Sequence, residues 1–226
     1  MRHELELGDW IVTSDNSAAI GEKPADNVFA TDALTAKFAA RVALLEQWAA
    51  GSEPEALLLH NFSGEDQWER YVQGIEELFA EISRPMPKCA GSSESNMATL
   101  QSSIAVTMFG KRKAALDQPS RLSWYIYGQP LVGKDVLEQS EQVAELKKIA
   151  DALSNGLIQR VWPVGSKGIA REAELLFGQK VNVSEIVDTA ASAGPASCVL
   201  IGVSSKERKP LEIHFGPCLY PLIRKD

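Results

Sequence analysis

The sequence of 226 residues contains only three cysteines, Cys89, Cys198 and Cys218, and no two of them form a CxxC pair. Structural zinc sites and disulfide frameworks need closely spaced or paired cysteines, so neither is expected. The N-terminus carries acids in place of an apolar segment, which argues against a signal peptide. No apolar run approaches the roughly 20 residues of a membrane span. We therefore expect a cytoplasmic protein with no membrane partner.

Basic charge is also scarce. The chain has 23 Lys and Arg residues against 30 Asp and Glu residues, which gives a net charge of −7. Nucleic acids bind to clusters of Lys and Arg, so no nucleic-acid partner is expected. An acidic protein can still bind nucleotides, because Mg²⁺ bridges carboxylates and phosphates.

Several catalytic signatures are missing. The three histidines, His3, His60 and His214, have no HxH or HExxH spacing. The sequence has neither a GxSxG elbow nor a GxxxxGK[ST] phosphate loop. The segment 128–134 contains two glycines and a lysine, but it has the wrong length for such a loop and lacks the following Ser or Thr. The candidate chemistry therefore rests on carboxylates and small polar residues.

What the sequence does contain is an alternation of strand-like runs and helical stripes. Strands are predicted at 8–14, 55–62, 98–109, 122–127, 198–203 and 211–215. Helices are predicted at 35–50, 64–82, 136–153, 166–177 and 184–192, with Ser166 and Ser184 as N-caps of the last two. This mixture predicts α/β or α+β layers. The charged stretch 111–121 is interpreted as a seam, which gives predicted domains at 1–118 and 119–226.

The segment 15–23 follows an apolar run and brings together an acid, small residues, a glycine and a lysine. Small residues let a ligand approach the backbone closely. A carboxylate where a strand ends can hold Mg²⁺, and a lysine can meet a phosphate as a point charge. An ordinary polar turn has the same composition, so both interpretations stay open for this segment alone.

Acids occur beside apolar elements at three further places. Asp32 stands just before the first predicted helix, and Glu46 lies beside the apolar stripe of that helix. A buried, unpaired carboxylate is costly, so Glu46 either lies at the rim of the stripe, pairs with a base such as Arg41, or serves a site. Glu94 belongs to a polar loop predicted at 91–96. Carboxylates that converge favour Mg²⁺ over Zn²⁺.

The order of these segments resembles the superfamily of aminoimidazole ribonucleotide synthase, thiamine-monophosphate kinase and selenophosphate synthetase, known as PurM-like. In thiamine-monophosphate kinase an Asp-Asp-Ala-Ala segment is followed by Thr-Thr-Asp. A helix then carries an Asp five residues before a Gly-Ala-x-Pro, and a Gly-Gly-acid loop precedes a long strand. Here the segments 15–18, 30–32 and 90–94 take the corresponding places, and Glu46 lies five residues before Gly51. The similarity covers roughly residues 9–112.

The chain departs from that pattern at specific positions. Asn16 replaces the second acid, Glu46 replaces an Asp, and the Gly-Gly-acid loop becomes Gly-Ser-Ser-Glu at 91–94. The second half, about 100 residues, is shorter than usual for the superfamily. With the segments 60–62 and 192–195, these features are most similar to the short α-ribazole kinase branch. That branch phosphorylates the 5′-hydroxyl of α-ribazole during salvage of the lower ligand of cobalamin.

The resemblance implies a homodimeric kinase that uses ATP and Mg²⁺ on a small-molecule nucleoside. It implies a PurM-like N-terminal domain with a mixed sheet and flanking helices, and a smaller α/β C-terminal half. The implied Mg²⁺ ligands are Asp15, Asp32 and Glu46, and the implied catalytic residues are Asp32, Glu94 and Asn96. The implied ATP contacts are Asp15, Asn16, Lys23, Gly91, Ser92, Ser93, Ser166 and Lys167.

Three alternatives remain open from the sequence. The chain could be a ligase or cyclase that resembles aminoimidazole ribonucleotide synthase, or a non-catalytic nucleotide-binding protein. The loop 163–168, which carries Ser166 and Lys167, is equally typical of a plain helix N-terminus.

Overall fold

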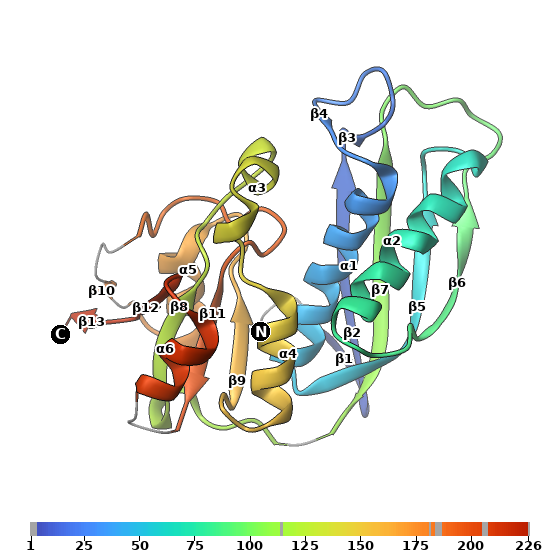
Figure 1. Ribbon diagram of the computed structural model, residues 1–226. Helices are drawn as coiled ribbons and strands as arrows, with labels where there is room; N and C mark the ends of the chain where they lie inside the picture. Colours follow the sequence, from blue (N-terminus) through green and yellow to red (C-terminus); the bar gives the residue numbers. More distant parts are fainter. Residues whose placement is uncertain (1–3, 114, 181, 184–186, 205–207, 226) are drawn as a thin grey trace. The chain divides into compact units, whose positions relative to one another are not determined.

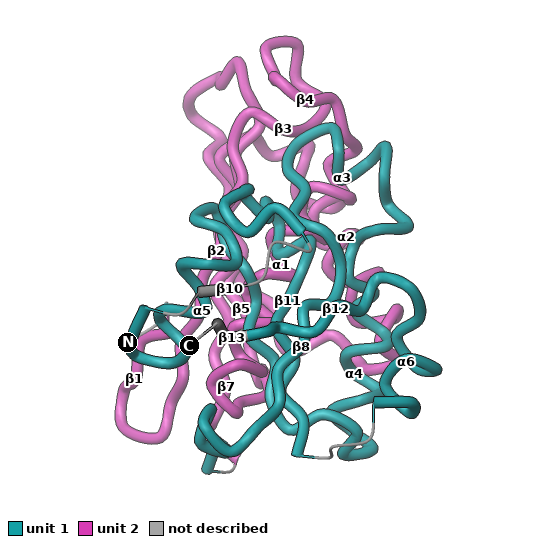
Figure 2. Tube along the Cα trace, turned by 90° about the vertical axis from the view of Figure 1, so that its left-hand side faces the viewer, with its two compact units in different colours: residues 1–2, 115–226 teal, residues 3–114 magenta. Residues whose placement is uncertain are grey.

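The computed structural model describes residues 4–113, 115–180, 182–183, 187–204 and 208–225. The chain divides into two compact units, which Figure 2 draws in magenta and teal, with the division between residues 114 and 115. We call them the N-terminal unit and the C-terminal unit and describe each by itself. The domain boundary predicted between 118 and 119 stays a prediction.

The N-terminal unit is built on a five-stranded mixed sheet in the order β1-β2-β7-β5-β6. Its strands are β1 (Leu5–Leu7), β2 (Trp10–Ala18), β5 (Ser52–Asn61), β6 (Lys88–Ser93) and β7 (Ser103–Arg112). Only the β5–β6 pair is parallel, and the other neighbours are antiparallel. Apolar residues alternate along β2, β5 and β7, so each of these strands buries one side against helices.

Helices α1 (Asp32–Ala49) and α2 (Trp68–Glu81) lie on one face of this sheet (Figure 1). Thr31 caps α1, because its hydroxyl accepts the N–H of Leu34 at 3.2 Å. The many alanines of α1 let it pack closely on β2, β7 and β5 and against α2. Gly74 of α2 is required for this packing, since a Cβ there would lie 1.8 Å from the carbonyl oxygen of Ala33.

Two short segments complete the N-terminal unit. Strands β3 (Ile20–Gly21) and β4 (Val28–Phe29) pair in parallel within the connection from β2 to α1. A 3₁₀ turn, η1 (Glu65–Gln67), leads from β5 into α2.

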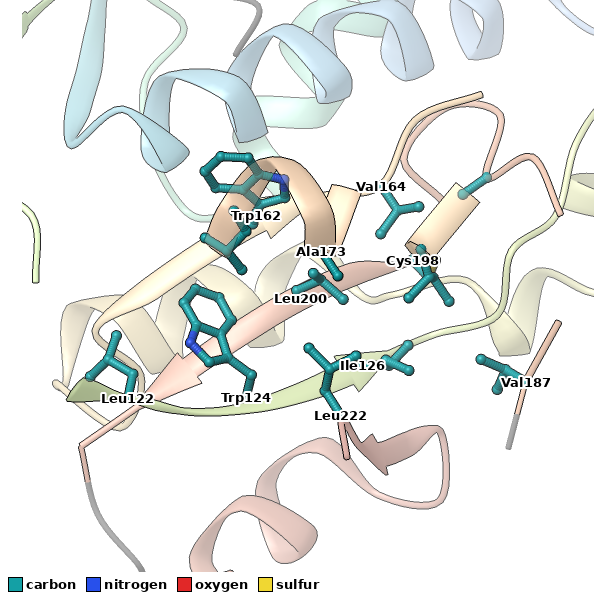
Figure 3. Close-up of a cluster of buried hydrophobic side chains, with 13 residues drawn as sticks. Leu122, Trp124, Ile126, Trp162, Val164, Ala173, Val187, Cys198, Leu200 and Leu222 are labelled. Atoms are coloured by element: carbon teal, nitrogen blue, oxygen red, sulfur yellow. The ribbon is translucent and has the colours of Figure 1, made fainter. Parts of the chain in front are cut away.

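The C-terminal unit contains a four-stranded antiparallel sheet in the order β12-β8-β11-β9. These strands are β8 (Ser123–Tyr127), β9 (Arg160–Pro163), β11 (Val199–Val203) and β12 (Leu219–Pro221). Figure 3 shows the buried cluster that Trp124, Ile126, Trp162 and Leu200 form with their neighbours. The remaining elements are α3 (Lys134–Glu138), α4 (Leu146–Ser154), α5 (Gly168–Phe177), α6 (Lys209–Phe215), η2 (Pro119–Arg121), η3 (Ser140–Gln142) and the pair β10 (Asn182–Val183) and β13 (Arg224–Lys225).

The predicted α/β class with a mixed sheet is confirmed, but two predicted elements are wrong. Residues 211–215 form part of helix α6 instead of a strand, because Pro210 lies in the first turn of the helix and Leu211 and Phe215, one turn apart, are both buried. The helix predicted at 136–153 is interrupted between α3 and α4. There the N–H of Ala144 donates to the carbonyl of Ser197 at 2.7 Å, which fixes the chain in a non-helical path.

Of the two predicted helix caps, one differs from the structure and the other cannot be compared with it. Helix α5 begins at Gly168 after Lys167, and no side chain caps it, so Ser166 is not the N-cap. Ser184 lies outside the described residues, and residues 187–192 contain no helix. Among the described residues, every helix is too short or too polar to span a bilayer.

Candidate functional site

Several elements of the N-terminal unit begin or end along one side of its sheet, at the ends of the strands. Strands β2, β5 and β6 end there and β7 begins there, since Ala18 pairs with Ser103 and Asn61 pairs with both Ile104 and Ser93. Helices α1 and α2 begin near the same edge. Helix N-termini expose unpaired N–H groups, and ligands of α/β proteins bind where strands end. We call this region the strand-end edge.

Two adjacent cavities lie along the strand-end edge. The first has a volume of about 420 Å³ and is lined by segments 63–67 and 94–98 together with Lys23. The second has a volume of about 490 Å³ and is lined by segment 91–93 and by Trp68 and Glu69 of α2. Glu65 and Ser95 line both cavities, so they form the boundary between them.

Lys23 reaches the first cavity from the β3–β4 connection. Its ammonium donates to the carbonyl and the hydroxyl of Thr99 at 2.7 and 3.0 Å. Its backbone N–H donates to Oδ2 of Asp26 at 2.8 Å. An ammonium has three N–H donors, so one remains for a ligand oxygen.

Glu94 and Asn96 share a tight turn on the other side of the first cavity. Oε1 of Glu94 accepts the backbone N–H groups of Asn96 and Met97 at 2.7 and 3.1 Å. These two hydrogen bonds, chiefly the one from the N–H of Asn96, hold the pKa of the Glu94 carboxyl below its ordinary value. Glu94 is therefore a carboxylate at neutral pH.

Asn61, at the end of β5, connects the loop that follows it to the end of β6. Its Nδ2 donates to the carbonyl of Gly64 at 2.6 Å and to Oγ of Ser93 at 3.0 Å. Its Oδ1 accepts the N–H of Ser63 at 2.9 Å. The side chain is buried, so its amide holds both segments in place.

The loop predicted at 91–96 is wrong for its first half. Residues 91–93 are the end of strand β6, and only 94–96 lie in the following loop. Gly91 is needed because a Cβ there would lie 1.9 Å from the carbonyl oxygen of Leu59 on β5. Gly91, Ser92 and Ser93 line the second cavity as strand residues.

Asp15 and Asn16 do not lie in a loop either. Both belong to β2 and pair with Val106 and Ala105 of β7. Successive strand residues point to opposite faces, so Asp15 is on the α1 side with the buried Thr13, and Asn16 is on the other face. The two side chains therefore cannot contact one ligand from the same face.

Asp15 and Glu46 are within electrostatic reach of each other. Burial, with a smaller contribution from the negative charge of Glu46, raises the pKa of Asp15 to about 7, while the backbone N–H of Asn16 opposes that rise. Glu46 is itself buried in α1. Of the other two predicted metal ligands, Glu46 is the one whose charge acts on Asp15.

Asp32 lies apart from this pair. It begins α1 while Glu46 is 14 residues further along the same helix, which separates them by about 21 Å at 1.5 Å per residue. A Mg²⁺ ion holds its ligands at about 2.1 Å, so one ion cannot contact both residues. The described residues contain no group of three or more His, Cys, Asp or Glu side chains that could hold a metal. The predicted three-ligand Mg²⁺ site does not fit this structure.

Arg70 of α2 binds Asp32 instead. Its Nη2 and Nε donate to Oδ2 of Asp32 at 2.8 and 3.0 Å. The backbone N–H of Asp32 donates to Oε1 of Glu22 at 3.1 Å. Asp32 is completely buried and does not line either cavity, so its predicted catalytic role lacks a direct contact with them.

Ser166 and Lys167 lie in the C-terminal unit, in the exposed turn before α5. The carbonyl of Thr189 accepts the N–H of Ala170 at 3.0 Å, so the chain itself satisfies one donor at this helix N-terminus. This arrangement suits the alternative of a plain helix start.

Several residues of the strand-end edge were missed in the sequence. They are Glu65, Trp68, Glu69 and Arg70. Asn61 and Ser95 lie within the predicted segments 60–62 and 91–96 but had no individual role assigned. A usable signal was the Gly64-Glu65-Asp66 run, because a glycine followed by acids is typical of a helix start.

No protein-family model matches the chain, and no curated protein matches it. Solved structures do match. Hydrogenase maturation protein HypE in complex with ATP is 13% identical with a TM-score of 0.65, and the match covers 96% of this chain and 77% of that one. Thiamine monophosphate kinase from Aquifex aeolicus is 12% identical with a TM-score of 0.63, and the match covers 95% and 85%.

AaThiL complexed with AMPPCP and TMP is 13% identical with a TM-score of 0.56, and the match covers 98% of this chain and 82% of that one. At such identities the likeness establishes the fold. The chain has the PurM-like fold, which confirms the fold that the resemblance implied. The finer likeness to the α-ribazole kinase branch stays a prediction.

Proposed function

We propose that the protein is a cytoplasmic, homodimeric kinase that binds ATP with Mg²⁺ and phosphorylates a nucleoside hydroxyl. The 5′-hydroxyl of α-ribazole is the favoured acceptor, on the sequence resemblance. Two proteins of the same fold carry ATP or AMPPCP in their structures, which supports an ATP-dependent activity. The low identity of these proteins leaves the acceptor to experiment.

The observation that carries the proposal is the meeting of Lys23, Glu94 and Asn96 around one cavity at the strand-end edge. Phosphoryl transfer needs little covalent chemistry from the protein and depends on positioning and charge neutralisation. In this proposal Lys23 binds a phosphate oxygen with its remaining N–H donor. Glu94, held as a carboxylate by two backbone N–H groups, accepts a hydrogen bond from the acceptor hydroxyl, and Asn96 orients it.

The neighbouring cavity supplies the second binding region of the proposal. Gly91, Ser92 and Ser93 offer small side chains and hydroxyls, and Trp68 offers an aromatic ring to a base. Asp15 and Glu46, the other predicted Mg²⁺ ligands, line neither cavity, so no phosphate contact is assigned to a metal at this pair. No step is assigned to a metal at Asp32, because Arg70 already binds that carboxylate.

The test is a kinase assay with ATP, Mg²⁺ and α-ribazole, with the phosphate ester measured by mass spectrometry. Lys23→Ala should lower kcat/KM for ATP at least about tenfold, because that is the typical effect of losing one hydrogen bond to a charged group. Lys134→Ala, an exposed lysine of α3, is the matched control and should match the wild type. Absence of any phosphate ester, together with absence of Mg·ATP turnover, would refute the proposal.

A second candidate is a nucleotide-binding protein without catalysis. The ion pair of Asp32 with Arg70 favours it, because a predicted catalytic acid is thereby occupied. Calorimetry would then detect Mg·ATP binding without turnover, and Asp32→Asn would leave the affinity unchanged. Ester formation by the wild type would exclude this candidate.

A further inference from the structure

The carboxylate of Asp32 is satisfied on one side only. The side chain is completely buried, yet its Oδ1 has no hydrogen-bond partner among the described residues. Its Oδ2 accepts both bonds from Arg70. A buried carboxylate oxygen that lacks a partner is costly, so this group retains an unused capacity to bind a positive charge.

A second carboxylate is fixed beside it. Oε1 of Glu22 accepts the backbone N–H of Asp32 at 3.1 Å, while Oε2 of Glu22 lies 3.9 Å from Nε of Arg70. Two carboxylates from different segments thus face one guanidinium.

The guanidinium is a permanent cation in these surroundings. An arginine guanidinium stays protonated throughout the physiological pH range. Arg70 therefore cannot vacate the position by losing its proton at any physiological pH.

We propose that Arg70 is a built-in cation which occupies a divalent-cation site formed by Asp32 and Glu22, and that this site binds Mg²⁺ or Mn²⁺ only when the guanidinium is removed. Proteins commonly hold Mg²⁺ by one or two carboxylates and several waters, and Asp32 and Glu22 supply that number. The guanidinium supplies positive charge at this place without a metal. The inference does not depend on the proposed kinase function.

The first experiment compares thermal stability with and without a few millimolar MgCl₂ or MnCl₂. Arg70→Ala leaves a buried carboxylate uncompensated, so its Tm should fall by roughly 5–10 °C. Added Mg²⁺ or Mn²⁺ should recover most of that loss, while the Tm of the wild type should not respond. Calorimetric titration of Arg70→Ala with MnCl₂ should show one additional site relative to the wild type.

Three further variants make the result specific. Arg84→Ala removes another arginine that pairs with a glutamate, Glu53, at the opposite end of α2, and should gain no response to the cation. Arg70→Lys keeps the positive charge and should behave as the wild type. The double variant Arg70→Ala, Asp32→Asn should lose the recovery.

The proposal is overturned if Arg70→Ala and Arg84→Ala respond equally to Mg²⁺, or if wild-type Mn²⁺ binding is lost in Asp32→Asn. Failure of Arg70→Ala to fold even with Mn²⁺ present also counts against it, because a cation in the same site should restore the fold. Loss of kinase activity has no bearing on these readouts, so failure of the proposed function and failure of this inference are distinguishable.

Discussion

Asp26 binds Ser102 through both of its carboxylate oxygens. Oδ1 accepts the backbone N–H of Ser102 and Oδ2 accepts its hydroxyl, each at 2.7 Å. Because Oδ2 also accepts the N–H of Lys23, this carboxylate ties the segment that carries Lys23 to the residue before β7. The position of Lys23 at the first cavity therefore depends on a residue that contacts no ligand in our proposal.

Asp26→Ala should loosen the 19–31 segment. It removes three hydrogen bonds to a charged acceptor, so the free energy of unfolding should fall by about 1.5–3 kcal/mol. Urea denaturation measures this change, and hydrogen exchange should show lost protection at Asn27 and Val28. The exposed Glu138→Ala is the control. Unchanged exchange in this segment would contradict the assigned role.

Gly74→Ala should destabilise the N-terminal unit although alanine favours helices. The new methyl group would overlap the carbonyl of Ala33, and overpacking costs about 1–3 kcal/mol, more than the roughly 1 kcal/mol gained in helix propensity. Chemical denaturation should show the net loss. Glu76→Ala, on an exposed turn of the same helix, should change stability by less than about 0.5 kcal/mol. A more stable Gly74→Ala protein would show that the helices can separate without cost.

Gln47→Leu should weaken the attachment of α1 to the sheet. The amide nitrogen of Gln47 reaches the carbonyls of Ile11 and Met108 at 3.0 Å each and Oγ1 of Thr13 at 3.2 Å. Removing it leaves buried acceptors without a donor, so we expect a loss of about 2–4 kcal/mol. The same substitution at the exposed Gln73 should be nearly neutral. Equal unfolding midpoints for the two variants would rule out this anchoring role.

Asp15→Asn should alter how stability depends on pH. The pKa of Asp15 is about 7 in the folded protein against 3.8 as its ordinary value, so the folded state binds this proton more tightly. The contribution of Asp15 is therefore fully present below about pH 4 and is lost as pH rises through 7.

Relative to the wild type, Asp15→Asn should gain stability between pH 5 and pH 7, by at most about 1.4 kcal/mol per pH unit. Thermal denaturation across this range measures the difference, with the exposed Glu55→Gln as the control. Parallel pH profiles for the wild type and Asp15→Asn would show that the carboxyl is ionised at little cost.

Periodicity was sufficient to locate most of the long elements. The apolar stripes of 35–50 and 64–82 correspond to α1 and α2, and the runs at 55–62 and 122–127 correspond to β5 and β8. The sequence could not indicate that β2 continues through Ala18. These residues are small and polar, and they are held in the strand by pairing with β7 about ninety residues away.

The segments that carry the candidate site could be predicted from the sequence, but their arrangement in space could not. Lys23, Glu94 and Asn96 belong to segments whose composition already indicated a ligand site. Their meeting depends on the register of β5, β6 and β7, which local composition does not encode. The contact of Asp32 with Arg70 joins residues 38 positions apart, so nothing near Asp32 in the sequence indicated that it is already paired.

The strand order β1-β2-β7-β5-β6 has a consequence for synthesis on the ribosome. β7 lies between β2 and β5, yet it is the last strand of its unit to be made. Until residue 112 has left the exit tunnel, β2 and β5 both lack their shared neighbour. The sheet is therefore incomplete, and the apolar residues of these strands cannot be fully buried. We therefore expect the N-terminal unit to fold in one step, only after β7 has been synthesised and can insert between β2 and β5.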